Sequence, residues 1–143
     1  MATNTEAKIW MAQKARISTI LPVYSIAWPA APFTPPSAGS ALQPYLRIGR
    51  TSASPDPIFV SDNQPHLRAG ILSIVLVYPM RDGLTAEMYD AAACKIAEHF
   101  PDGLEMRYQD VCVKVTSAPD IFEGYEDNGY WTIPISISWR CFA

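Results

Sequence analysis

Residues 130–142 alternate between apolar and polar side chains along their whole length, and this pattern constrains the fold more than any other feature. The apolar positions are Trp131, Ile133, Ile135, Ile137, Trp139 and Cys141. Successive side chains of a strand point to opposite faces of a sheet, so a period of two predicts one long strand with a buried face. Pro134 has no N–H for a ladder, so we expect this strand at a sheet edge or its proline at an unpaired position.

A second long strand is predicted over residues 67–78, where the centre from Ile71 to Val77 is apolar on both faces apart from Ser73. Such a strand is typical of the middle of a sheet that is covered on both sides. Pro79 ends it. Shorter strands are expected over 23–28, 45–51, 104–108 and 111–116, with a brief pairing over 58–60.

Two helices are predicted, over residues 3–20 and 84–100. Thr3 followed by Glu6 is a capping-box pattern for the first helix. Thr85 is the expected N-cap of the second helix, whose apolar residues recur at intervals of four. The resulting order, α-β-β-β-α-β-β-β, lacks regular βαβ alternation. It predicts a single α+β domain over 1–143, with a mostly antiparallel sheet and two helices packed on it.

Three long connections stand out as contact surfaces, because long loops in compact domains tend to be functional. Residues 29–44 hold five prolines, residues 52–66 hold further turn signals, and residues 117–129 are acidic. The acidic residues of the last loop are Asp120, Glu123, Glu126 and Asp127. Aromatic side chains in or beside these loops are candidate interface anchors, because rigid rings bury area at low entropic cost.

Composition excludes several classes of protein. Hydrophobic residues make up 49% and charged residues 17%, with a formal net charge of −3, an ordinary globular balance. The basic residues are dispersed, so nothing marks a surface for sequence-specific nucleic acid. Three widely spaced cysteines, Cys94, Cys112 and Cys141, argue for a reducing compartment. No apolar run approaches the ~20 residues of a membrane helix, and no signal peptide is evident, so we expect a soluble protein made in a cytoplasm.

Catalytic and cofactor motifs are missing from the sequence. His66 and His99 lie far from any close ligand pair, so no zinc site is expected. Cys94 and His99 share a predicted helix, but positions i and i+5 diverge by roughly 140°. Neither a nucleophile elbow nor a phosphate-binding glycine loop occurs. We therefore expect no catalytic residue, no metal, no cofactor and no enzyme activity.

Several short motifs occur in a familiar order. A segment from Ile26 to Pro36 contains a tryptophan and a Pro-Phe-Thr-Pro-Pro loop, and Pro44-Tyr45-Leu46-Arg47-Ile48 follows it. The strand ending in Tyr78-Pro79 comes next, then the helix ending in Phe100-Pro101-Asp102-Gly103, and finally the segment from Gly129 to Ile137. In this order and spacing the chain resembles the tail terminator proteins of long-tailed bacteriophages and prophages, from about Ile9 to Arg140. The residues from Ser37 to Gln43 and the Tyr130-Trp131 order depart from the family pattern.

The resemblance implies a structural virion protein that forms a ring, typically a hexamer, on the finished tail tube. Such a ring ends tube polymerisation and provides the surface to which the head joins. The implied partners are further copies of the chain, the tail tube protein and a head–tail connector protein, with assembly in the host cytoplasm and no membrane or cofactor involved. The alternatives are another head–tail connector or tail-completion subunit, or an unrelated small-molecule-binding or hydrolytic domain.

The candidate interface residues lie in or beside the long loops. They are Trp28, Phe33, Tyr45, Arg47, Arg50, Phe59, Phe122 and Tyr125. Arg47 and Arg50 are expected to face the acidic loop of a neighbouring copy.

Overall fold

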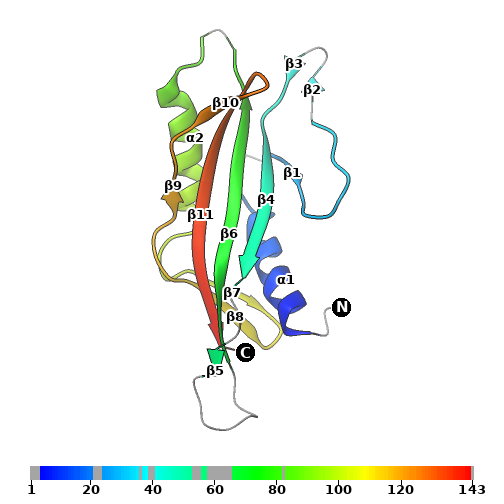
Figure 1. The fold of residues 1–143 in the computed structure, drawn as a ribbon, viewed down its shortest axis with the longest axis vertical. Helices are drawn as coiled ribbons and strands as arrows, with labels where there is room; N and C mark the ends of the chain where they lie inside the picture. The colour runs from blue at the N-terminus through cyan, green and yellow to red at the C-terminus, as the bar shows by residue number, and fades with distance from the viewer. Residues whose placement is uncertain are drawn as a thin grey trace.

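The computed structural model of the chain describes residues 4–20, 24–35, 37–38, 41–52, 56–57, 66–81 and 83–142. It contains two helices and a large sheet (Figure 1). The elements are α1 (Thr5–Ile17), β1 (Ser25–Ala27), β2 (Ser37–Ala38), β3 (Ala41–Leu42), β4 (Tyr45–Ser52), β5 (Asp56–Pro57), β6 (His66–Pro79), α2 (Ala86–Glu98), β7 (Glu105–Tyr108), β8 (Val111–Val115), β9 (Asp120–Ile121), β10 (Tyr125–Asp127) and β11 (Tyr130–Phe142).

The two long predicted strands pair with each other and form the centre of the sheet. Strands β6 and β11 run antiparallel in unbroken register from Pro79↔Tyr130 to Leu67↔Phe142. The order across the sheet is β1-β4-β6-β11-β8-β7, and β9 and β10 pair with β11 along its other side. Figure 1 shows the long strands β4, β6 and β11 standing side by side. The predicted α+β class is therefore confirmed.

The sheet is mixed in one place. Strand β1 runs parallel to β4, with Ser25 opposite Tyr45 and Ala27 opposite Arg47. All other strand pairs in the described part of the chain are antiparallel. Strand propensity alone does not carry direction, so the sequence predicted the strand but not its orientation.

Pro134 does not place β11 at an edge, because β11 is paired on both sides. Phe122 N–H donates to Pro134 O at 2.9 Å on the β9 side. In an antiparallel ladder the N–H and C=O of one residue point to the same side, so the Pro134 nitrogen also faces β9. The missing N–H therefore costs β11 no bond to β6, and the predicted alternative of an unpaired position is correct.

Both helices pack on one face of the sheet. That face carries three cross-strand rows with no solvent exposure, formed by Leu46, Leu76, Ile133, Ile74, Ile135, Leu72 and Ile137 together with Ile48 at the rim. Helix α1 contributes Ile9 and Ile17 to the core, and α2 contributes Ala93 and Ile96. Fully burying one such aliphatic side chain stabilises the fold by about 1.5–3 kcal/mol.

The opposite face of β6 is covered at its Pro79 end, where Val77 is only 2% exposed, but it is open in its middle, so the prediction of cover on both sides is correct only in part. Ile71 is 43% exposed, and Ser73 and Val75 are only half-buried. The apolar pattern of a strand does not distinguish a second face covered by another layer from one that lies uncovered among small residues of the same sheet.

The helix boundaries differ slightly from those predicted. Helix α1 begins after Asn4, whose Oδ1 accepts from Ala7 N–H at 2.7 Å, so Asn4 and not Thr3 is the N-cap. Asparagine caps a helix as well as a hydroxyl residue does, which makes the boundary ambiguous by one residue. Helix α2 has the predicted Thr85 at its N-cap position.

The predicted loops contain short strands. The acidic loop holds β9 and β10, and both lie along β11, so it forms an ordered ribbon. The proline-rich loop holds the β2–β3 hairpin. The brief strand expected over 58–60 lies outside the described residues. The nearest described element before it is β5, which pairs with β6.

Candidate interaction surfaces

The β9–β10 ribbon, residues 120–127, presents two large aromatic side chains to solvent. Phe122 is 52% exposed and Tyr125 is 50% exposed. The carboxylate residues of the ribbon are exposed as well. Exposed aromatic rings bordered by polar or charged side chains are typical of a protein–protein contact. A strip of acidic residues that only faced solvent would carry no such rings.

Gly124 holds the ribbon close to the molecule. A Cβ at this position would lie 2.2 Å from Trp131 Nε1 and 2.6 Å from its Cε2. The Trp131 ring in turn stacks on Tyr89 of α2, with ring centroids 6.1 Å apart. The absence of a side chain at Gly124 thus fixes the ribbon over an aromatic layer, and it positions Phe122 and Tyr125 on either side.

Phe33 and Tyr45 form a ladder of rings with Tyr130. The ring centroids are 4.9 Å apart for Phe33 and Tyr45, and 5.9 Å apart for Tyr45 and Tyr130. Tyr45 is only 8% exposed, so its ring supports Phe33 from below and presents little surface of its own. Phe33 remains half-exposed and accessible to a partner.

Trp28 packs with helix α1 at the β1 edge of the sheet. Its ring lies edge-on to Trp10 with centroids 5.9 Å apart, and Lys14 Nζ lies 5.2 Å from the Trp28 centroid. Arg50 Cζ lies 4.4 Å from the Trp10 centroid. These cations over aromatic faces keep their charge at the surface while their stems cover apolar rings.

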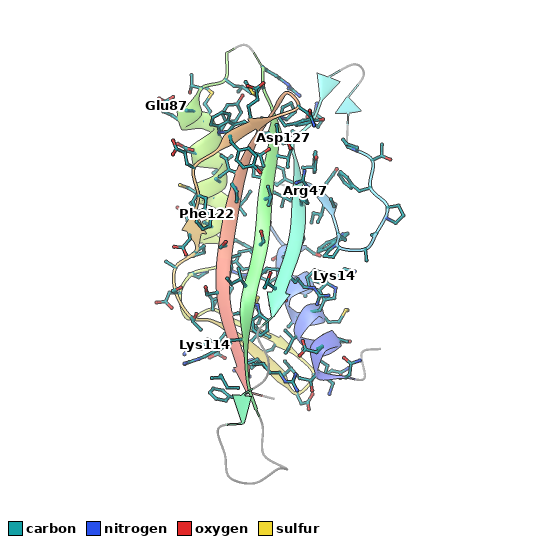
Figure 2. The ribbon with its side chains drawn as sticks, in the orientation of Figure 1. Lys14, Arg47, Glu87, Lys114, Phe122 and Asp127 are labelled. Atoms are coloured by element: carbon teal, nitrogen blue, oxygen red, sulfur yellow. The ribbon has the colours of Figure 1, made fainter. Side chains whose placement is uncertain are left out.

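Arg47 projects from the open face of β4 and is exposed, whereas Phe59 lies outside the described residues. Figure 2 places Arg47 and Lys14 on the side of the molecule away from Phe122 and Glu87. The structure thus separates the sequence-predicted residues into two groups. One group lies along β1 and β4, and the other lies along β9 and β10.

A groove between α2 and the segment before β9 is absent from the sequence predictions. It is an open, shallow hollow of about 400 Å³ that is lined mainly by apolar groups. The lining residues are Cys94, Ala97, Glu98, Pro101, Asp102, Ala118, Pro119 and Ile121. The sequence predicted a solvated acidic loop for this segment. Ile121, an apolar residue within it that the structure shows exposed at the border of the groove, is the signal that could have indicated a contact surface here.

The open sheet face is the second surface missed from the sequence. A shallow hollow of about 520 Å³ lies on it, bordered by Thr51, Ile71 and Ser138. Phe142, 51% exposed, lies on this face at the end of β11. The register of β4, β6 and β11 brings small residues of three strands together on this surface. The sequence alone does not contain that register, so this surface was not predicted.

Two cysteine thiols have pKa values above the ordinary one. Burial raises the pKa of the Cys141 thiol, and burial also raises that of Cys112. Both thiols are therefore protonated and weakly nucleophilic at neutral pH. Across the described residues, no three His, Cys, Asp or Glu side chains gather as metal ligands would. Neither described helix has the length and hydropathy that crossing a bilayer requires.

A family model and a solved structure each match nearly the whole chain. A model of the phage tail terminator protein family matches residues 8–139. One solved structure superposes with a TM-score of 0.76 at 22% sequence identity, covering 99% of this chain and 98% of its own, which shows a shared fold. No curated protein matches the sequence. Since the family model spans nearly the whole chain, the protein belongs to the phage tail terminator family.

Proposed function

We propose that copies of this chain form a ring, a hexamer, on the end of the phage tail tube. The ring stops the addition of tube subunits and offers its far side to the head–tail connector. Family membership supports a structural role in the phage tail. The geometry favours a subunit completed by neighbours, since part of one sheet face, the outer side of β9–β10 and the outer edge of much of β4 are bare in the described structure.

The bare edge of β4 is the observation that carries this proposal. Strand β1 pairs only with Tyr45 to Arg47, so β4 from Ile48 to Ser52 has no partner on its outer side within the described residues. Monomeric proteins usually cover or shorten such edges because unpaired backbone groups promote association. A ring gives each subunit two neighbours through a heterologous contact that closes by rotation.

The proposed partners are the tail tube protein on one side of the ring and a head–tail connector protein on the other. Assembly takes place in the host cytoplasm and the product remains in the virion tail. The role is geometric, and no step in it makes or breaks a covalent bond.

Tube polymerisation in the presence of the purified chain tests the proposal. We expect electron micrographs to show tubes whose growth stops and whose ends carry a ring. Phe122→Ala and Tyr125→Ala should weaken capping while circular dichroism stays unchanged, because both rings are half in solvent. Met80→Ala, 45% exposed and outside the β9–β10 ribbon, is the matched control. Tubes of unchanged length without rings would refute the proposal. If micrographs of particles that carry a gold-labelled copy of the chain show it away from the tube end, another connector subunit is favoured.

A further inference from the structure

The charges of this chain are segregated along its sequence and across its fold. Residues 7–55 contain no aspartate or glutamate, and their cations are Lys8, Lys14, Arg16, Arg47 and Arg50. Residues 115–139 contain no lysine or arginine, and their anions are Asp120, Glu123, Glu126 and Asp127. Strands β1 and β4 end the sheet on one side, whereas β9 and β10 border β11 on the other. The two stretches therefore give the sheet a positive β1–β4 border and a negative β9–β10 border, whereas β8 and β7, which end the sheet beyond β11, carry both signs, with Arg107 and Lys114 beside Glu105.

The positive border has an apolar loop at its centre. Residues 29–35 follow Trp28 and expose Ala30, Ala31, Pro32 and Pro35. Lys14 lies over Trp28, and Arg47 lies opposite Ala27, so cations flank this loop. We call Lys14, Arg47, Arg50 and the loop 29–35 the cationic edge. Lys8 and Arg16 are engaged elsewhere, Lys8 with Asp110 and Arg16 with the carbonyl of His99.

The negative border has an apolar groove at its centre. This is the 400 Å³ groove between α2 and β9, and the carboxylates of Glu98 and Asp102 form part of its lining. Asp120 and Glu123 lie beside it on the ribbon and are exposed. Within the described part of the chain these four carboxylates take part in no ion pair. We call the groove and these four residues the acidic edge.

We infer that the loop 29–35 of one copy seats in the apolar groove of the next copy, with Lys14 and Arg47 facing Glu98 and Glu123. The inference rests on the proposed ring and names the surfaces that join its subunits. The proline-rich loop and the groove are both apolar, and the charges beside them are opposite: cations flank the loop and carboxylates flank the groove. Because proline restricts the loop in advance, less conformational entropy is lost when it docks.

A second copy is the occupant because the two matching surfaces lie on opposite sides of the same molecule. A contact from one side of a subunit to the other side of the next is heterologous, and repeated by rotation it closes a ring. Standard interfaces take about 800 Å² from each partner. That is about a tenth of the 8373 Å² surface of this chain, so two edges leave most of the molecule for the tube and head sides.

Charge reversal on one edge at a time tests the contact. The acidic-edge variant is Glu98→Lys with Glu123→Lys, and the cationic-edge variant is Lys14→Glu with Arg47→Glu. Each alone should raise the concentration needed for assembly by at least about tenfold in sedimentation velocity, because like charges then face each other. Lys114→Glu with Arg140→Glu changes the net charge as the cationic-edge variant does, but outside both edges, and should assemble like the wild type. Circular dichroism checks each fold, and Arg47→Glu alone replaces the double variant if that one misfolds.

Mixing the two edge variants in equal amounts distinguishes this contact from others. Each variant keeps one native edge, so the native edges pair, and the two reversed edges pair with exchanged signs. We therefore expect the mixture to recover assembly at wild-type concentrations. If an edge instead met the same edge of another copy, the variant in which that edge is intact would assemble without mixing, which would overturn the inference. A mixture of folded variants that stays dissociated also overturns it.

The remaining outcomes separate this inference from the proposed function. Edge variants that assemble normally overturn the contact and leave tube capping standing. If the edge variants assemble normally but no longer cap tubes, the groove binds the tube protein and not another copy, and the inference is again overturned. A wild-type chain that is monomeric at every concentration overturns the contact between copies, and the capping assay then decides the function separately.

Discussion

The change from Gly124 to alanine tests how the β9–β10 ribbon is held. The new Cβ would lie 2.2 Å from Trp131 Nε1. Non-bonded heavy atoms are comfortable at about 3.5 Å or more, so the ring has to move by roughly 1.3 Å or the ribbon has to lift. Movement of Trp131 disturbs its stacking on Tyr89. Overpacking of this kind costs about 1–3 kcal/mol, and we expect Gly124→Ala to lower the free energy of unfolding by that amount.

Urea unfolding followed by circular dichroism measures the loss. Gly49→Ala is the matched control, because its Cβ would meet Ser73 Cβ at an ordinary 3.8 Å. That substitution should be neutral or stabilise the protein by about 0.4–1 kcal/mol, since alanine reduces the freedom of the unfolded chain. Equal stabilities for the two variants would show that the ribbon does not rest on the Trp131 ring, and the argument from close approach would be wrong.

Three further predictions concern the fold. Asn4→Ala should lower the free energy of unfolding by about 1 kcal/mol in urea titrations through loss of the helix cap, whereas Asn4→Asp should keep it. Ile74→Ala, at a fully buried site, should cost about 2–5 kcal/mol, whereas Ile71→Ala on the open face should cost less than about 1 kcal/mol in the same assay. Burial and then the Arg16 charge lower the pKa of His99. The unfolded state therefore binds the proton more readily, and stability should fall as the pH drops from above 6.5 through the lowered value; a flat pH profile, or one unchanged in His99→Gln, would contradict this.

Elements with a strong local period could be predicted from sequence, and elements defined by distant neighbours could not. The alternation over 130–142 corresponds to β11 residue for residue, because a buried face imposes that period directly. The acidic residues of the ribbon, in contrast, predicted a loop. Their strands exist because β11 offers a free side to pair with, and that information lies in another part of the chain.

The candidate interface residues show the same limit. Phe122 and Tyr125 are exposed as an anchor must be, but Tyr45 is buried beneath Phe33. A tyrosine at the start of a strand gives no indication of which face it takes until the register is known. The apolar groove was missed for a related reason, since its walls come from α2 and from a segment some twenty residues later that only the sheet brings together.

In the proposed contact, the cationic edge also disfavours pairing of the bare β4 strand with the same strand of another copy. An unpaired edge strand invites pairing with any other strand, and charged side chains on the edge are a common protection against it. Arg47 precedes the unpaired stretch of β4 and Arg50 lies within it, so their charges oppose the approach of the same edge of another copy. The acidic edge removes that repulsion. In the proposed ring, Arg47 therefore opposes association of like edges and favours association of unlike ones, which would select a closed ring over a random aggregate.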